Sequence, residues 1–255
     1  MLRRNSNAKS YYVAVCHDVV SGIPVEDAFS KNGPLPEVDE VHAMEVEGAL
    51  KHATPDHLAD LAAAFGARRG PAFKEALTGV AWAAINDGPE RLSSANIDHL
   101  ARLADAFTKN DIDDDATEAV AMQVAVRGND LLPQANIGQI ATLTLAFCGR
   151  DDSEFQDETN FHNAMGKLAL RVTAHGDELL RAASAEQLAT LKGAFGGPAV
   201  QLATREVPFE PAEADHPEAF AKVVNEMKSR DEAARLAHNS QLKLQLADRA
   251  LSVER

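Results

Sequence analysis

Residues 50–65 read LKHATPDHLADLAAAF, and the same pattern returns at residues 92–107 (LSSANIDHLARLADAF), 132–147 (LPQANIGQIATLTLAF) and 180–195 (LRAASAEQLATLKGAF). The four segments align without gaps and share the pattern L-x-x-A-[TNS]-x-x-[HQ]-[LI]-A-x-L-x-x-A-F. Equivalent leucines lie 42, 40 and 48 residues apart. Repeats of this length are typical of proteins whose helical units stack on one another, because one unit cannot bury its own apolar face.

The fifth position of each copy is a residue type that caps helix N-termini. Side-chain oxygens of Thr, Asn and Ser accept hydrogen bonds from the free amides of a first helical turn. Three positions later each copy carries His or Gln, and Gln at this spacing is typical of a capping box. Because His and Gln share the position, we interpret the histidines as helix-end hydrogen-bonding groups and not as metal ligands. The pairs are Thr54 and His57, Asn96 and His99, Asn136 and Gln139, and Ser184 and Gln187.

Apolar residues at helical spacing also occur between consecutive copies, which predicts a second helix in each unit. We expect these helices to end at Gly88, Gly128 and Gly176, since glycine just past a helix end can adopt the left-handed conformation that closes it. The expected buried faces are Phe73, Leu77, Val80 and Ala84 in one unit, Ala116, Val120 and Val124 in the next, and Phe161, Met165, Leu168 and Val172 in the third.

The fold class that follows is all-α, an α-solenoid of about four two-helix repeats of 40–48 residues. We expect an N-terminal capping segment at 1–49, which holds an apolar run at 11–20 and a linker at 22–36 marked by Gly and Pro. The repeat domain is expected at 50–197, a Pro-containing linker at 198–216 and a C-terminal helix at 217–255. The apolar stripe of that helix is imperfect as a heptad, so it either packs along the repeats or reaches another chain.

Composition narrows the function classes. Apolar residues make up 45% of the chain and aromatic residues only 5%, which favours closely packed helices. The formal net charge of −14 disfavours RNA binding, which depends on Lys and Arg, although a local basic stripe of Arg102, Lys109, Arg127 and Lys167 is possible. Two cysteines do not make a disulfide framework, and the sequence lacks an apolar run long enough to cross a membrane.

Motifs for catalysis, cofactors and metals are missing from the sequence. The acidic run at 111–115 resembles the start of a calcium loop, but Ala116 and Met122 occupy the positions where such a loop needs Gly and Glu. We therefore interpret the run as a solvated turn and expect a chain that is not an enzyme. Partner binding is expected at equivalent positions of the first helices that the pattern leaves variable and exposed: Asp60, Arg102, Thr142 and Thr190.

The repeat pattern, followed by a second helix and a glycine, resembles the octotricopeptide and heptatricopeptide repeats, which are related to the helical part of FAST-kinase-like and RAP-domain proteins. Similar repeats also occur in some plant-pathogen effectors. The resemblance covers residues 50–195 and implies either organellar RNA binding or a structural place in an organellar assembly. Because the repeats are acidic and few, and the C-terminal helix is unlike a RAP domain, no nucleotide-reading positions are transferred to this chain.

The expected function is a non-catalytic scaffold, an accessory subunit of a larger protein complex such as a mitochondrial one. Other protein subunits would be contacted by the solenoid surface, the N-terminal segment and the C-terminal helix, and an organellar RNA-binding protein is the alternative. Arg3, Arg4 and Lys9 precede any acidic residue, as in an organelle-targeting segment, although an ordinary basic N-terminus fits equally well. A mitochondrial or other organellar location is therefore expected, and otherwise an intracellular soluble protein.

Overall fold

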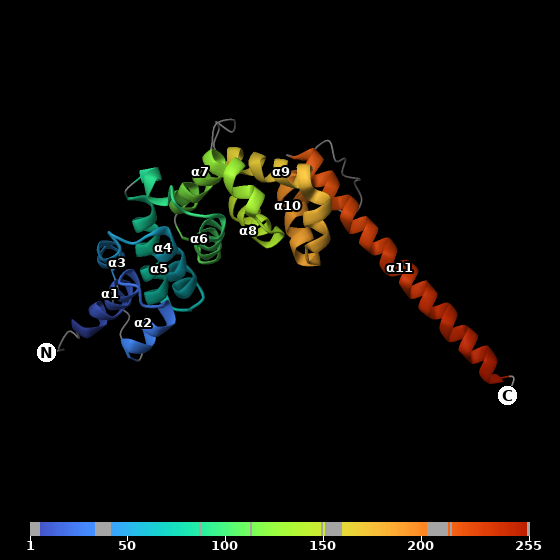
Figure 1. The fold of residues 1–255 in the computed structure, drawn as a ribbon, viewed down its shortest axis with the longest axis horizontal. Helices are drawn as coiled ribbons and strands as arrows, with labels where there is room; N and C mark the ends of the chain where they lie inside the picture. Colours follow the sequence, from blue (N-terminus) through green and yellow to red (C-terminus); the bar gives the residue numbers. More distant parts are fainter. Residues whose placement is uncertain are drawn as a thin grey trace. The chain divides into compact units, whose positions relative to one another are not determined.

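The computed structural model describes residues 6–33, 42–86, 88–112, 114–148, 150, 160–202, 214 and 216–253, and in these ranges the chain is helical without strands (Figure 1). Contacts divide it into two compact units, Met1–Leu168 and Ala169–Arg255. The helices are α1 (Ser6–Val20), α2 (Val25–Lys31), α3 (Ala43–Ala49), α4 (Pro55–Gly66), α5 (Pro71–Ile85), α6 (Ile97–Lys109), α7 (Asp114–Leu131), α8 (Ile137–Phe147), α9 (Asn160–Leu179), α10 (Ala185–Leu202) and α11 (Pro217–Val253), with 3₁₀ turns η1 (Gly88–Leu92), η2 (Leu132–Gln134) and η4 (Leu180–Ala182).

The helices of the first unit form two rows. The predicted first helices α4, α6 and α8 pack on one another in that order, and α3, α5 and α7 pack on one another in the second row (Figure 1). Contacts of α4 with α5 and of α6 with α7 join the rows. The predicted apolar faces of α5 and α7 are buried between them, as are the phenylalanines that end the repeat pattern, Phe65, Phe107 and Phe147.

The L-x-x-A part of the pattern forms the same turn in all four copies. The amide of the alanine donates to the carbonyl of the leucine three residues before it, at N···O distances of 2.9 Å for Ala53, 2.9 Å for Ala95, 3.1 Å for Ala135 and 3.1 Å for Ala183. Both side chains of each turn are buried. The turn therefore fixes the start of each first helix against the core.

The predicted capping boxes are confirmed in all four copies. The amide of residue 57 donates to Thr54 Oγ1, and the amide of Thr54 donates to Nδ1 of His57. Asn96 with His99, Asn136 with Gln139 and Ser184 with Gln187 make the same reciprocal bonds. The two histidines thus do the same work as the two glutamines, as the shared position predicted.

One of the three predicted glycine helix ends is wrong. Gly88 has the expected positive φ of 70°, but Gly128 lies inside α7. The backbone of α9 leaves helical geometry at His175 (φ −127°, ψ 15°), directly before Gly176, so this helix is interrupted where its end was predicted. A Cβ at residue 128 would lie 3.3 Å from Cβ and Cγ of Lys167, and one at residue 176 would lie 3.0 Å from Cδ of Lys222. Both glycines leave room for a lysine side chain of another helix, and at Gly128 the local sequence does not distinguish this role from a helix end.

The N-terminal segment contains more helix than predicted. The expected linker at 22–36 includes α2, which begins after Pro24 with Glu26 and Asp27 in its first turn, where the helix dipole favours acids. The ring of Phe29 is buried and packs edge-on against Phe65, with 5.8 Å between centroids. A buried anchor on the first repeat therefore makes this stretch helical, and residues 34–41 lie outside the described ranges.

The second unit is formed by the end of α9, η4, α10 and α11. Helix α10 continues to Leu202, past the predicted boundary at 197, and most of the predicted linker lies outside the described residues. Helix α11 lies where the C-terminal helix was predicted. Its start packs on α10 through buried Ala219, Phe220 and Val223, and His216 packs edge-on against Phe195 at 5.9 Å between ring centroids.

Candidate binding surface

Polar side chains connect neighbouring first helices of the first unit. Arg102 Nη2 on α6 lies 2.6 Å from Asp60 Oδ1 on α4. One turn earlier, His99 Nε2 lies 3.1 Å from Asp56 Oδ1. Gln139 on α8 donates to the carboxylate of Asp98 on α6 at 3.1 Å. Each helix in the row is therefore joined to the next by groups at or near the variable positions of the repeat.

The structure brings together two of the four residues predicted to bind a partner. Asp60 and Arg102 form the ion pair between α4 and α6, with 35% and 33% of their side chains exposed. Thr142 occupies the equivalent position on α8 and Thr190 that on α10 in the second unit, and both are half-buried. These positions are thus less exposed than the pattern indicated. Their role in partner binding stays a prediction.

The ion pair itself contributes little to stability. A partly exposed pair of this kind is worth about 0.2–1 kcal/mol, since both charges keep much of their hydration. Asp98 lies 3.9 Å from the same guanidinium, so Arg102 is shared between two carboxylates. These ion pairs therefore fix the orientation of side chains between α4 and α6 and add little to the free energy of unfolding.

The four cations of the predicted RNA stripe are engaged within the protein. Besides Arg102 with Asp60, Lys109 pairs with Asp105 at 2.8 Å. Arg127 donates to the carbonyl oxygens of residues 92 and 95 at 3.2 and 3.0 Å, and Lys167 donates to Asn129 at 3.0 Å. Each of the four cations therefore has a partner within the protein, and they do not form a row of unpaired positive charges.

Sequence reasoning missed a set of arginines that hold the repeat turns. Arg91 donates to the carbonyls of residues 50 and 51, Arg127 to those of residues 92 and 95, and Arg230 to those of residues 180, 181 and 183. In each case the acceptors belong to the L-x-x-A turn. The donors come from η1, α7 and α11, at non-equivalent places in the chain, so the repeat alignment carried no signal for them.

The far part of α11 lies outside the packed surface. Arg230 anchors the helix to the η4 turn, with its guanidinium 2.8 Å from the carbonyl oxygen of Ala183. Residues 231–238 are all exposed, although the helix continues to Val253. Exposure of consecutive residues shows that every side of this stretch faces solvent in the described structure.

The described ranges contain neither a metal-binding cluster nor a helix that could cross a membrane. His, Cys, Asp and Glu side chains nowhere gather there in threes or more at metal-binding distance. Within the same residues no helix combines the length and apolar character that a membrane-crossing helix needs. Comparison of the chain with protein-family models, with curated proteins and with solved structures found no match.

Proposed function

We propose that the chain is a non-catalytic α-solenoid scaffold, a subunit that holds a larger protein assembly together. The observation that carries the proposal is the exposed stretch of α11 after Arg230. Most helical stability in proteins comes from packing one face of the helix against other elements, and this stretch lacks that packing in the described structure. A partner protein that covers the stretch would supply that packing.

The two rows of helices in the first unit support the same proposal. Stacked helical repeats present long surfaces of regularly spaced side chains, which suits binding of extended partners. Asp56 on α4 and Asp98 and Asp105 on α6 are, like the cations of the stripe, engaged within the protein. The whole chain, however, has a net charge of −14, which fits a basic protein segment better than a nucleic acid.

The RNA-binding alternative has less support. The net charge is −14, and the cations proposed for a basic stripe are engaged within the protein. We further propose that the chain is related to the octotricopeptide and heptatricopeptide repeat proteins. Its assembly is proposed to be mitochondrial or to belong to another organelle.

The test is purification of the tagged full chain from its source cells under mild conditions, followed by size determination with and without ribonuclease. We expect elution as a large assembly that ribonuclease leaves intact, with partner proteins identified by mass spectrometry. Elution at monomer size, or a shift to monomer size after ribonuclease, would refute the scaffold proposal.

Two variants locate the contact. Deleting residues 231–255 keeps Arg230 and should release the partner while thermal unfolding of the rest is unchanged. A second variant replaces Asp60, Arg102, Thr142 and Thr190 with alanine, which tests the first-helix surface separately. If partner recovery is unchanged in the quadruple variant, these four residues are not the binding site, and if it is unchanged in the deletion, α11 is not.

A further inference from the structure

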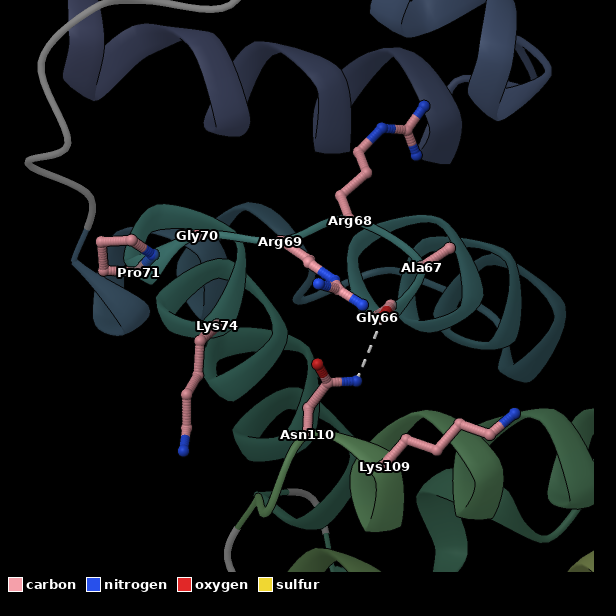
Figure 2. Close-up of a pocket in the computed structure, with 9 residues that line it drawn as sticks. All are labelled: Gly66, Ala67, Arg68, Arg69, Gly70, Pro71, Lys74, Lys109 and Asn110. Atoms are coloured by element: carbon pink, nitrogen blue, oxygen red, sulfur yellow. Dashed lines mark hydrogen bonds between the residues drawn. The ribbon is translucent and has the colours of Figure 1, made fainter.

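A basic pocket lies where α4 ends, α5 begins and α6 ends (Figure 2). Its volume is about 510 Å³, within the range of small-molecule sites. Four cationic side chains line it, and acidic and aromatic side chains are absent from its lining. The lining residues are Gly66, Ala67, Arg68, Arg69, Gly70, Pro71, Lys74, Lys109 and Asn110.

Two of the four cations are already neutralised. Arg68 points away from the pocket toward α2, where it pairs with Glu26 at 3.2 Å and its guanidinium carbon lies 4.0 Å from the ring centre of Phe29 (Figure 2). Lys109 pairs with Asp105 at 2.8 Å. The two cations left for a ligand are therefore Arg69 and Lys74.

The side chains of Arg69 and Lys74 are exposed, and neither forms a hydrogen bond or ion pair with a residue that the structure describes. They belong to the α4–α5 connection and the first turn of α5, and both line the pocket; Figure 2 shows Arg69 directed toward Gly66 and Lys74 directed away from it. The chain has 39 acidic and 25 basic side chains, which makes two unpaired cations in the lining of one pocket unusual in its composition. A bound anion with several charged oxygens would supply both with a partner of opposite charge.

The floor of the pocket is rigid. Asn110 donates to the carbonyl oxygens of Gly66 at 3.2 Å and Ala106 at 2.8 Å, so both its amide hydrogens are used and its orientation is held. A Cβ at residue 66 would lie 3.1 Å from Nδ2 of Asn110 and 3.2 Å from Cβ of Ala106, so α4 and α6 are in close contact here. The cavity is thus preformed, which lowers the cost of binding.

The opposite edge adds positive potential from the backbone. Gly70 precedes α5 with φ 128°, a conformation that favours glycine, and no side chain caps the first turn of this helix. The first amides of a helix lack intrahelical acceptors, and the helix dipole places partial positive charge at this end. The four repeat helices, in contrast, have their first turns capped by side chains.

We propose that this pocket binds a small, multiply charged phosphate ligand, either a polyphosphate or a phosphate monoester. Arginine and lysine together recognise phosphate by charge-assisted hydrogen bonds, and phosphate carries enough charge to satisfy both cations. The lining has no aromatic side chain on which a nucleobase would stack, and its cations match the charge of a phosphate, so we take the phosphate as the recognised group. The inference is independent of the scaffold function and of its partner.

The test is calorimetric titration of the full chain with sodium tripolyphosphate and, separately, with glucose 6-phosphate, at fixed ionic strength. We expect saturable binding of at least one of the two at one site per chain. The double variant Arg69→Ala/Lys74→Ala should weaken it at least tenfold. The matched control, Lys51→Ala/Lys228→Ala, removes the same charge from exposed positions elsewhere and should bind as the wild type does. Thermal unfolding of both double variants verifies that they are folded.

The titration can overturn the proposal in three ways. Saturable binding of neither compound would exclude the site. Equal weakening in both double variants would mean that only overall charge matters. A single-stranded RNA oligonucleotide that binds more tightly than tripolyphosphate, and loses binding in the Arg69/Lys74 variant alone, would show that the pocket is part of an RNA surface.

Discussion

Substitution of Gly79 tests the packing of the second-helix row most directly. This glycine lies in α5 against α3, where a Cβ would lie 2.6 Å from the carbonyl oxygen of Ala43, 2.6 Å from Cβ of Val46 and 2.9 Å from Cγ1 of Val46. Two of these neighbours are fixed by the backbone of α3. An alanine therefore forces the two helices apart, because no side-chain rotation relieves the overlap.

The expected size follows from two opposing effects. Overpacking of a core contact costs about 1–3 kcal/mol, and backbone neighbours place Gly79→Ala in the upper part of that range. Replacing glycine by alanine inside a helix returns about 1 kcal/mol. We therefore expect Gly79→Ala to lower the free energy of unfolding by about 1–2 kcal/mol.

Gly166 provides the matched control in the same unit. It also lies inside a helix, α9, but a Cβ there would meet nothing within 4 Å. Gly166→Ala should therefore raise the free energy of unfolding by up to about 1 kcal/mol through helix propensity alone. The two identical substitutions are expected to have opposite signs.

Urea unfolding followed by tryptophan fluorescence measures both variants. Trp82 is the single tryptophan and lies in α5, so the signal reports on the unit that contains both glycines. The shift in midpoint at constant m gives the change in stability. A Gly79→Ala variant at least as stable as the wild type would refute the close approach of α3 and α5, and equal destabilisation by Gly166→Ala would show that the reasoning about space is wrong.

Three further predictions concern individual side chains. His99→Gln should keep the wild-type free energy of unfolding, because Gln139 and Gln187 fill the same capping role. His99→Ala should lower that free energy by about 0.5–1 kcal/mol in urea unfolding. An equal loss in both variants would refute the capping role. Arg127→Ala leaves two carbonyl groups of the L-x-x-A turn without their charged donor and should lower the free energy of unfolding by about 2–3 kcal/mol. An unchanged free energy of unfolding would show that Arg127 does not hold the turn. Burial raises the pKa of the Cys16 thiol to about 12. Since an unfolded thiol ionises near pH 8.5, the unfolded state loses its proton first, and stability relative to Cys16→Ala should fall as pH rises from about 8.5 to 12. A constant difference over that interval would mean that the thiol is accessible.

The helix starts of the repeats could be predicted from the sequence because their determinants are local. Each capping box joins residues three positions apart, and each L-x-x-A turn closes a hydrogen bond over the same distance. Such interactions depend on residue type and spacing and hardly on the rest of the fold. The apolar faces of α5 and α7 were predictable for a related reason, since burial follows helical periodicity.

Only the tertiary structure decided what non-local contacts do. Gly128 has the sequence features of a helix end, yet it lies inside α7, where a Cβ would come within 3.3 Å of the side chain of Lys167 on α9. Asp60 and Arg102 were predicted as exposed positions and instead pair across 42 residues of sequence. The basic pocket likewise brings the α4–α5 connection to the end of α6. In each case the structure depends on contacts with residues that are distant in the sequence, and a local sequence pattern does not predict which residues those are.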